Sequence, residues 1–287
     1  TLRQHNFEAF IVGGSVRDRL LGREVNDWDL TTNAHPHEVS ACFDKVIETG
    51  IQHGTVTVIL DEEHIEITTY RIDGEYGDGR RPNDVQFTRS LNEDLLRRDF
   101  TVNAIAWDPI NASLEDPYNG VADLQKSILR AVGDPQARFR EDGLRVLRAI
   151  RFSTVLDFSI EEATQRGAIE AIDVLGKIAV ERVQVELFKT LQSPYSGRGL
   201  SLIKTFGVTE ICFPELPSIT DRIWSHLERA IEHCEVNIET RLALVFYAVF
   251  QDQKCSKLEL ATLVKKTLKR LKVSNKLSQQ VLHLVSL

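Results

Sequence analysis

The chain has 287 residues, of which 42% are hydrophobic, and carries a formal net charge of −7 at pH 7. This length accommodates two or three packed units, no apolar run reaches the ~18 residues that a membrane span needs, and no N-terminal targeting pattern is visible. The acidic balance argues against a general polyanion-binding protein. The four cysteines lie far apart, without metal-ligand spacing, which indicates reduced core thiols in a cytoplasmic protein.

The first predicted elements are a strand that ends near Val12 and a helix over Ser15–Leu21, joined by Gly13 and Gly14. Glycines at such a junction let backbone amides approach an anion, and the helix dipole favours negative charge there. Gly13 and Gly14 are therefore predicted to contact a phosphate group. Taken alone, a Gly-Gly pair is more often a simple turn.

Two aspartates follow in the segment Asp27-Trp28-Asp29-Leu30, where polar and apolar residues alternate. On a strand this alternation places both carboxylates on one face. Adjacent carboxylates repel each other unless a cation or a proton neutralises them, and Mg²⁺ binds one or two carboxylates together with substrate phosphates. An isolated Asp-x-Asp is often only solvent-exposed, but after the glycine turn it predicts chemistry on a nucleoside triphosphate.

The next segments predict a small sheet and then a loop. Thr55–Leu60 and the alternating run 64–68 are expected to pair as antiparallel strands, with Glu66 and Thr68 on one face. The segment 71–84 is rich in Gly, Asp and Arg and has no hydrophobic pattern, which is typical of a mobile loop. From about residue 136 onward the pattern is helical, so we expect an α+β fold whose α/β part precedes an all-helical remainder.

The segment Phe139–Phe152 is predicted to form one amphipathic helix. Its apolar arc contains Leu144, Val146, Leu147 and Ile150, and the opposite arc contains Glu141, Asp142, Arg145 and Arg148. One interpretation is a helix that is stabilised by ion pairs between side chains three and four residues apart.

A second interpretation gives this helix a role in reading a base. Aspartate offers only hydrogen-bond acceptors and arginine only donors. An Asp142/Arg145 pair would therefore match the edge of cytosine or adenine, which presents an exocyclic amine beside a ring-nitrogen acceptor. Uracil and guanine present a carbonyl and a ring N–H there, and each bidentate match discriminates by ~1–3 kcal/mol.

Near the end of the chain, basic residues are clustered in a run that contains no acidic residue. Its basic residues are Lys265, Lys266, Lys269, Arg270, Lys272 and Lys276. Such a stripe could bind a nucleic-acid backbone through counterion release, or it could simply be the solvated face of one helix.

Five segments, in this order, resemble the motifs of the class II tRNA nucleotidyltransferases, or CCA-adding enzymes, and their bacterial poly(A) polymerase relatives. FIVGGSVRDRLLG with NDWDL resembles the metal and triphosphate motif, LLRRDFTVNA (95–104) the sugar-contacting motif, and EDPYNGVADL (115–124) the hinge. REDGLRVLRAIRF resembles the protein template for the incoming base, and AVERVQVEL (179–187) the neck-stabilising motif. Five ordered matches make the resemblance highly specific.

The resemblance implies a domain order. It places a catalytic nucleotidyltransferase head, with a small mixed or antiparallel sheet and helices, at residues 1–135. A helical neck that recognises the base would follow at 136–192, and a helical body that binds tRNA at 193–287. We expect the family's C-terminal tail domain to be missing from this chain.

The resemblance also implies roles for individual residues. Asp27 and Asp29 would hold two Mg²⁺ ions, with Glu66 as a third catalytic carboxylate, and Gly14 and Arg17 would contact the phosphates of the nucleotide. The residues implied near the ribose and triphosphate are Arg98, Asp99 and Asn103. The residues implied to bind the base and phosphates are Asp142, Arg145, Arg148 and Arg151.

The activity implied is template-independent addition of C, C and A to the 3′ end of tRNA, from CTP and ATP, with release of pyrophosphate. The loop 73–82 would help to reshape the base site between C and A, which favours an enzyme that adds the terminal A. No membrane and no protein partner is implied.

Three alternatives stay open at this point. Within the family, the chain could be an A-adding split-function enzyme or a poly(A) polymerase relative. Outside that activity, it could be a catalytically inert RNA-binding module or a nucleotidyltransferase that acts on small molecules. The intact Asp27, Asp29, Asp142 and Arg145 argue against an inert module, and the basic stripe and the template-like helix argue against a small-molecule enzyme.

Overall fold

The computed structural model describes residues 1–25, 27–73 and 85–287. The chain divides into two compact units. The first unit comprises 1–141 with 161–164, and the second comprises 142–160 with 165–287. The finer division into head, neck and body stays a prediction. Within the described part of the chain, no helix is long and apolar enough to cross a membrane.

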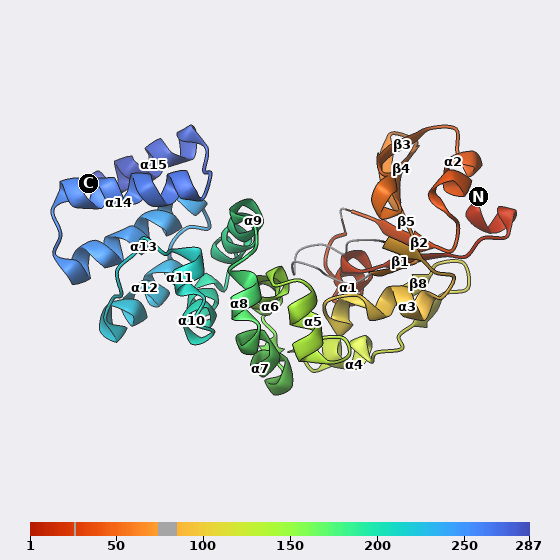
Figure 1. Ribbon diagram of the computed structural model, residues 1–287, viewed down its shortest axis with the longest axis horizontal. Coiled ribbons are helices and arrows are strands. Elements are labelled where there is room, and N and C mark those ends of the chain that lie inside the picture. The colour runs from red at the N-terminus through yellow and green to blue at the C-terminus, as the bar shows by residue number, and fades with distance from the viewer. Residues whose placement is uncertain (26, 74–84) are drawn as a thin grey trace. The chain divides into compact units, whose positions relative to one another are not determined.

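The first unit is built on a mixed sheet with the strand order β3-β4-β5-β2-β1-β8-β9 (Figure 1). Neighbouring strands are antiparallel except for β2 and β5, which are parallel. The strands are β1 (Ala9–Val12), β2 (Asp29–Thr32), β3 (Val46–Gly50), β4 (Thr55–Leu60), β5 (Glu63–Thr69), β8 (Ala106–Asp108) and β9 (Ser113–Glu115). The α+β prediction and the antiparallel pairing of β4 with β5 are confirmed.

Alternation along the strands gives the sheet two packed faces. Ile67 and Val58 pack with Leu2 and Val39, on the side of η1 and α2. On the other face, Val12 packs with Leu95 of α3. The helical elements of this unit are η1 (Leu2–His5), α1 (Gly14–Leu20), α2 (Pro36–Cys42), η2 (Ile51–His53), α3 (Leu91–Leu96), η3 (Thr101–Asn103), α4 (Gly120–Gln125) and α5 (Pro135–Glu141).

Two predictions in this unit need correction. Strand β2 begins only at Asp29, so Asp27 lies in the segment before the strand rather than on it. The predicted loop begins and ends as a two-stranded ladder, in which β6 (Arg71–Asp73) pairs with β7 (Val85–Phe87). Backbone pairing of this kind needs no apolar pattern in the sequence, which is why the pattern missed it. The rest of the loop, 74–84, lies outside the described residues, and the short strand β10 (Ile128–Leu129) follows α4.

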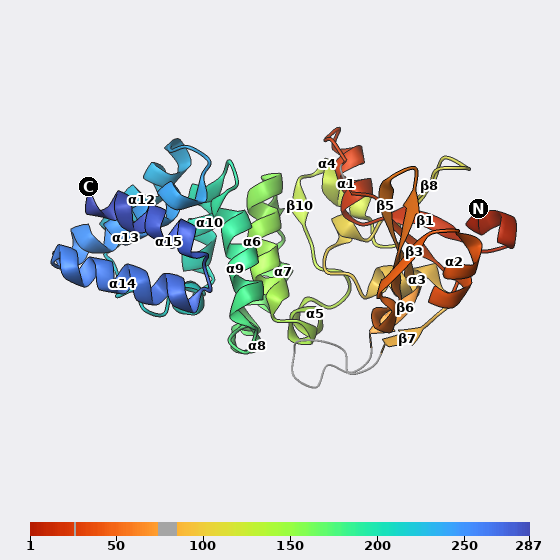
Figure 2. The same ribbon diagram turned by 90° about the horizontal axis from the view of Figure 1, so that it is seen from above.

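The second unit consists of packed helices, with one short strand, β11 (Ser159–Ile160), that the prediction of an all-helical region missed. Its helices are α6 (Leu144–Leu156), α7 (Glu162–Glu170), α8 (Ile172–Leu175), α9 (Val180–Leu191), α10 (Ser196–Thr205), α11 (Thr209–Cys212), α12 (Asp221–His233), α13 (Ile238–Gln253), α14 (Lys257–Arg270) and α15 (Asn275–Ser286). Helix α6 packs against α9 and α10, and α13 packs against α12 and α15 (Figure 2).

A buried arginine joins two helices of this unit. Arg241 of α13 is 0% exposed and donates hydrogen bonds to the carbonyl oxygens of Leu191 and Ser193. Leu191 is the last residue of α9 and Ser193 lies two residues beyond it, at the helix end where carbonyls lack intrahelical partners. The guanidinium therefore caps α9 and fixes its end against α13. All four cysteines are free, as predicted, but only Cys212 is fully buried.

Candidate active site

The glycine turn places the backbone beside an arginine and a carboxylate. Gly13 has φ 73°, a conformation that glycine adopts without strain. A Cβ atom on Gly13 would lie 3.1 Å from Nη1 of Arg98 and 3.9 Å from Oδ2 of Asp29. A larger residue would therefore be strained and would crowd the space between two polar groups. The helix that follows, α1, begins at Gly14 as the pattern predicts.

Asp29 and Glu66 lie opposite each other on the parallel strands β2 and β5. Both residues are exposed at this point of the sheet. The pKa of Asp29 is raised, first by partial burial and then by the charge of Glu66, with a smaller contribution from Asp27, while Arg98 opposes the rise. The sheet register therefore holds negative charges together at an energetic cost that a cation would remove.

This arrangement fits a divalent cation that is completed by a ligand. Among the residues that the structure describes, no three His, Cys, Asp or Glu side chains lie close enough to hold a metal ion by themselves. Carboxylates such as those of Asp27 and Asp29 are hard oxygen donors of the kind that Mg²⁺ binds, and Mg²⁺ typically takes its remaining ligands from phosphates and water. The donor set thus suits a metal that binds together with a phosphorylated substrate.

A buried aspartate that the sequence analysis did not single out organises the arginines next to this site. Asp94 of α3 is 0% exposed. It accepts hydrogen bonds from Arg97 (Nη2 at 2.9 Å) and Arg98 (Nη2 at 3.2 Å) and from the hydroxyl of Thr31 at 3.3 Å. Burial by itself would raise the pKa of Asp94, but the charges and hydrogen bonds of the two arginines outweigh it and hold the pKa below its ordinary value.

Asp94 also accepts from the backbone N–H of Arg71, at 3.3 Å. It therefore ties α3 to β2, two residues after Asp29, and to the start of β6. The only signal in the sequence is its spacing: Asp94 precedes Arg97 and Arg98 by three and four residues, which brings the side chains together on a helix.

Three predicted nucleotide-binding residues form one hydrogen-bonded chain. Arg17, which is 8% exposed, donates to Oδ1 of Asn103 at 2.6 Å, and Asn103 donates to Asp99 at 3.0 Å. Arg17 also donates to the carboxylate of Asp18. The structure brings these residues together as predicted, while their contacts with a nucleotide stay a prediction.

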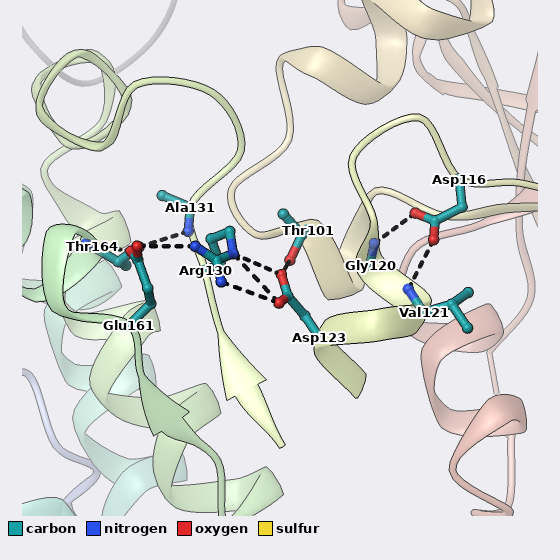
Figure 3. A network of polar contacts seen from close by, with 9 residues as sticks. All are labelled: Thr101, Asp116, Gly120, Val121, Asp123, Arg130, Ala131, Glu161 and Thr164. Atoms are coloured by element: carbon teal, nitrogen blue, oxygen red, sulfur yellow. Dashed lines mark hydrogen bonds and ion pairs between the residues drawn. The ribbon is translucent and has the colours of Figure 1, made fainter. Parts of the chain in front are cut away.

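The hinge-like segment packs against η3, the short helix that contains Asn103. Asp116 accepts from the backbone N–H groups of Gly120 and Val121, at 2.6 and 2.9 Å, and so caps α4 (Figure 3). A Cβ atom on Gly120 would lie 2.2 Å from the carbonyl oxygen of Thr101. Only glycine permits this approach, which seats α4 against η3.

Figure 3 also shows how Arg130 joins two carboxylates of the first unit. Arg130 donates to Asp123 at 3.0 Å and to Glu161 at 2.9 Å. Thr101 donates to the same Asp123 carboxylate at 2.8 Å, and Glu161 accepts from the backbone N–H of Thr164 at 2.8 Å. These bonds fix the segment 161–164 to the first unit.

The predicted helix over Phe139–Phe152 is interrupted, so that prediction is wrong. Helix α5 ends at Glu141 and α6 begins at Leu144. At the break the carboxylate of Asp142 accepts from the N–H of Leu144 at the start of α6, and close packing requires glycine next to it, because a Cβ atom on Gly143 would lie 2.5 Å from the backbone nitrogen of Leu175. Periodicity reports only the apolar face, and the four predicted apolar residues of α6 are indeed buried.

Asp142 therefore lies in the break and not on a helix with Arg145. Its backbone carbonyl accepts from the N–H of Arg145 at 2.9 Å, and its carboxylate accepts from the N–H of Leu144 at 3.0 Å. Arg145 is itself 7% exposed, so the opposite arc is not simply solvated. The two residues stay neighbours, although the turn and not helical spacing brings them together.

The other two predicted base- and phosphate-binding arginines share a buried glutamate. Glu186 of α9, 5% exposed, lies 2.5 Å from Nε of Arg151 and 3.7 Å from Nη1 of Arg148. Both guanidinium groups also lie over the ring of Phe152, at 4.0 and 5.1 Å from its centre. Arg148 and Arg151 thus form one cluster on α6.

The basic stripe is divided between exposed and paired residues. Arg270 donates to Glu215 and to the carbonyl of Cys212, both at 2.6 Å, and Lys272 pairs with Glu181. Lys265, Lys266, Lys269 and Lys276 are exposed. The charge of the stripe is therefore partly compensated, and nucleic-acid binding there stays a prediction.

Two family models match the chain. One, described as the Poly A polymerase head domain, matches residues 9–130, and the other, described as the probable RNA and SrmB-binding site of polymerase A, matches residues 157–219.

Relatives with the same printed name extend the match over the whole chain. The CCA-adding enzyme of Lactococcus lactis subsp. lactis (strain IL1403) is 42% identical over 291 residues, which covers 99% of this chain and 69% of the relative. The CCA-adding enzyme of Lactobacillus helveticus (strain DPC 4571) is 50% identical over 202 residues, 70% of this chain and 50% of the relative. The chain spans about half the length of several of the curated relatives that it matches.

Solved structures agree with this similarity. The crystal structure of the Bacillus stearothermophilus CCA-adding enzyme in complex with CTP superposes with a TM-score of 0.83 at 34% identity, and the match covers 99% of this chain and 67% of that one. A CCA-adding enzyme solved with ATP gives a TM-score of 0.73 at 25% identity, over 99% of this chain and 66% of that one.

Proposed function

We propose that this chain, which belongs to the CCA-adding enzyme family, adds C, C and A to the 3′ end of tRNA from CTP and ATP and releases pyrophosphate. The observation that carries the proposal is the register of Asp29 with Glu66 beside Gly13 and Arg98, which sets carboxylates next to a turn open to phosphate. The relatives solved with CTP and with ATP support the choice of nucleotides.

In this proposal the acidic residues hold divalent cations and the arginines hold phosphates. Asp27 and Asp29 would hold two Mg²⁺ ions, with Glu66 as a third carboxylate. When bound, such ions lower the pKa of an attacking hydroxyl and neutralise the departing pyrophosphate. Arg98, positioned by Asp94, and Arg17 would bind the triphosphate, so that positioning and charge neutralisation supply most of the catalysis.

The second unit would select the base. Asp142 offers acceptors and Arg145 donors, which together match the amine-and-ring-nitrogen edge that cytosine and adenine share. Arg148 and Arg151 would contact the base or its phosphates from α6. No nucleic-acid template is required by this scheme, because the protein itself presents the pairing groups. A cytoplasmic setting, expected from the cysteines, is part of the same proposal.

The experiment is an incorporation assay with each nucleotide separately. Three tRNAs, ending at the discriminator base, at C and at CC, are incubated with the purified chain, Mg²⁺ and one labelled nucleotide at a time. We expect CMP on the first two substrates and AMP only on the third. Incorporation of AMP alone would instead indicate an A-adding enzyme, repeated AMP addition a poly(A) polymerase, and no incorporation by the intact chain would contradict the proposal.

A further inference from the structure

One row of side chains crosses the sheet at the candidate active site. Asp29 on β2 lies opposite Glu66 on β5, and Glu66 lies opposite Thr57 on β4. The row ends on β3 at Ile47, which pairs with Thr57 and is 38% exposed. Because residues that pair on neighbouring strands point to the same face of a sheet, the two carboxylates, the hydroxyl and the isoleucine share one face.

Thr57 differs from the other threonines on this face in what its hydroxyl binds. The hydroxyls of Thr55 and Thr68 bond each other at 3.0 Å, and the hydroxyl of Thr31 donates to the carbonyl oxygen of Thr68 at 3.1 Å. The side chain of Thr57 is half-buried and makes no hydrogen bond to another residue that the structure describes. A hydroxyl next to Glu66 is therefore available to a ligand.

The strand order indicates the side from which an acceptor approaches the carboxylates. Gly13 directly follows β1, which flanks β2 on the side away from β5, and Arg98 lies beside Gly13. In phosphoryl transfer the attacking and leaving oxygens are roughly in line. With the triphosphate held on the β1 side, the attacking hydroxyl is expected on the side of β5 and β4, where Thr57 is the next residue of the row after Glu66.

We propose that Thr57 binds the last ribose of the RNA acceptor, through a hydrogen bond between its hydroxyl and the 2′-hydroxyl beside the attacking 3′-oxygen. The inference rests on the proposed function, because it needs an RNA 3′ end at the carboxylates. One hydroxyl can donate to or accept from another, and the 2′-hydroxyl is the group by which a protein distinguishes RNA from DNA. Thr57 therefore helps to select an RNA end, and the exposed Ile47 continues the surface for the same nucleotide.

The test is the transfer of AMP to two acceptors that differ by one oxygen atom: a tRNA that ends in CC, and the same tRNA with a 2′-deoxy terminal C. We expect the intact chain to prefer the ribose acceptor, measured as the ratio of the two kcat/KM values. Thr57→Val replaces the hydroxyl by a methyl group, and should lower this preference about fivefold, as the loss of one neutral hydrogen bond does. Thr57→Ser keeps the hydroxyl and should keep the preference.

Thr55→Val is the matched control, because it removes the same group from the same face of β4, where Thr68 already binds it. It should leave the preference for the ribose acceptor unchanged. An unchanged preference in Thr57→Val, or no preference in the intact chain, would refute the inference and leave the proposed function intact. If Thr57→Val does not fold, Thr57→Ala decides in the same way. No transfer to either acceptor by the intact chain would contradict the proposed function, and the inference with it.

Discussion

Two regions of the molecule differ in how their charged side chains are arranged: the sheet end with Asp29 and Glu66, and the break before α6. On β2 and β5 the register sets Asp29 against Glu66, two groups of the same sign, and the charge of Glu66 adds to the effect of partial burial in raising the pKa of Asp29. At the break and along α6, opposite charges are paired instead: Asp142 binds Arg182, and Arg151 binds Glu186.

The difference indicates what each region needs from a ligand. A cluster of like charges gains most from a cation, so the sheet end is suited to metal-dependent chemistry. A set of paired charges gains little from a free ion but offers oriented donors and acceptors, so the break is suited to recognising a base edge. We therefore expect the repulsion between like charges in the first region to favour cation binding, and the paired charges in the second region to favour binding of a base.

The largest expected effect comes from removing a carboxylate at the sheet end. Asp29→Ala should reduce nucleotide transfer by about 10²–10³-fold or more, because charge stabilisation of the transition state is lost, and should leave the fold intact. The measurement is single-turnover incorporation with Mg²⁺. Glu63→Ala, which removes an exposed acid at the other end of β5, is the control. Near-normal transfer by Asp29→Ala would contradict the assignment of metal-dependent chemistry to the sheet end.

The second effect concerns the buried carboxylate behind the site. Asp94→Asn should destabilise the protein by about 3 kcal/mol, because Arg97 and Arg98 lose a buried partner. Since the pKa of Asp94 is held below its usual 3.8, its contribution is complete above that pH and is lost as the pH falls through the lower folded-state value. Denaturant unfolding at pH 7 and at pH 3 measures both. A variant equally destabilised at the two pH values would contradict this assignment.

A third, smaller effect tests the break itself. Gly143→Ala should destabilise by about 1–3 kcal/mol, as overpacking does, because the new Cβ would press on the backbone of Val174 and Leu175. Gly176→Ala is the matched control, since its Cβ would meet only an ordinary contact at 3.5 Å. The readout is the melting temperature together with the CTP-over-UTP preference. If Gly143→Ala behaved like Gly176→Ala, close packing would not be what maintains the break.

The smallest effect sharpens the comparison, because it makes stability and activity move in opposite directions. Asp29→Asn should stabilise the metal-free protein at pH 7 by a few tenths of a kcal/mol, on the order of an exposed charge interaction. A raised folded-state pKa means that ionisation costs stability, so the gain should vanish below the ordinary value of 3.8 and should grow as the pH rises through the raised value. Thermal unfolding across pH 3–8 checks this, and a destabilised Asp29→Asn would show that Glu66 and Asp29 do not repel.

Several features followed directly from local chemistry in the sequence. The helix after Gly13, the β4–β5 pair and the buried face of α6 were predictable, because each depends on a turn residue or on side-chain periodicity within one segment. The pairing of Arg17 with Asn103, and the register of Asp29 with Glu66, join residues far apart in the chain. Their grouping was predicted from a resemblance and not from spacing.

The sequence by itself determined the glycine turn, the two aspartates, the apolar faces and hence the class of the fold, because these depend on residue type and on neighbours a few positions away. Only the tertiary structure decided that α5 ends before Gly143, that Asp94 gathers Arg97 and Arg98, and that Arg182 binds Asp142. The physical reason is that such features are set by contact with distant backbone and opposite charge: the backbone of Leu175 leaves no room for a Cβ on Gly143, and a buried carboxylate is stable only where its partners converge.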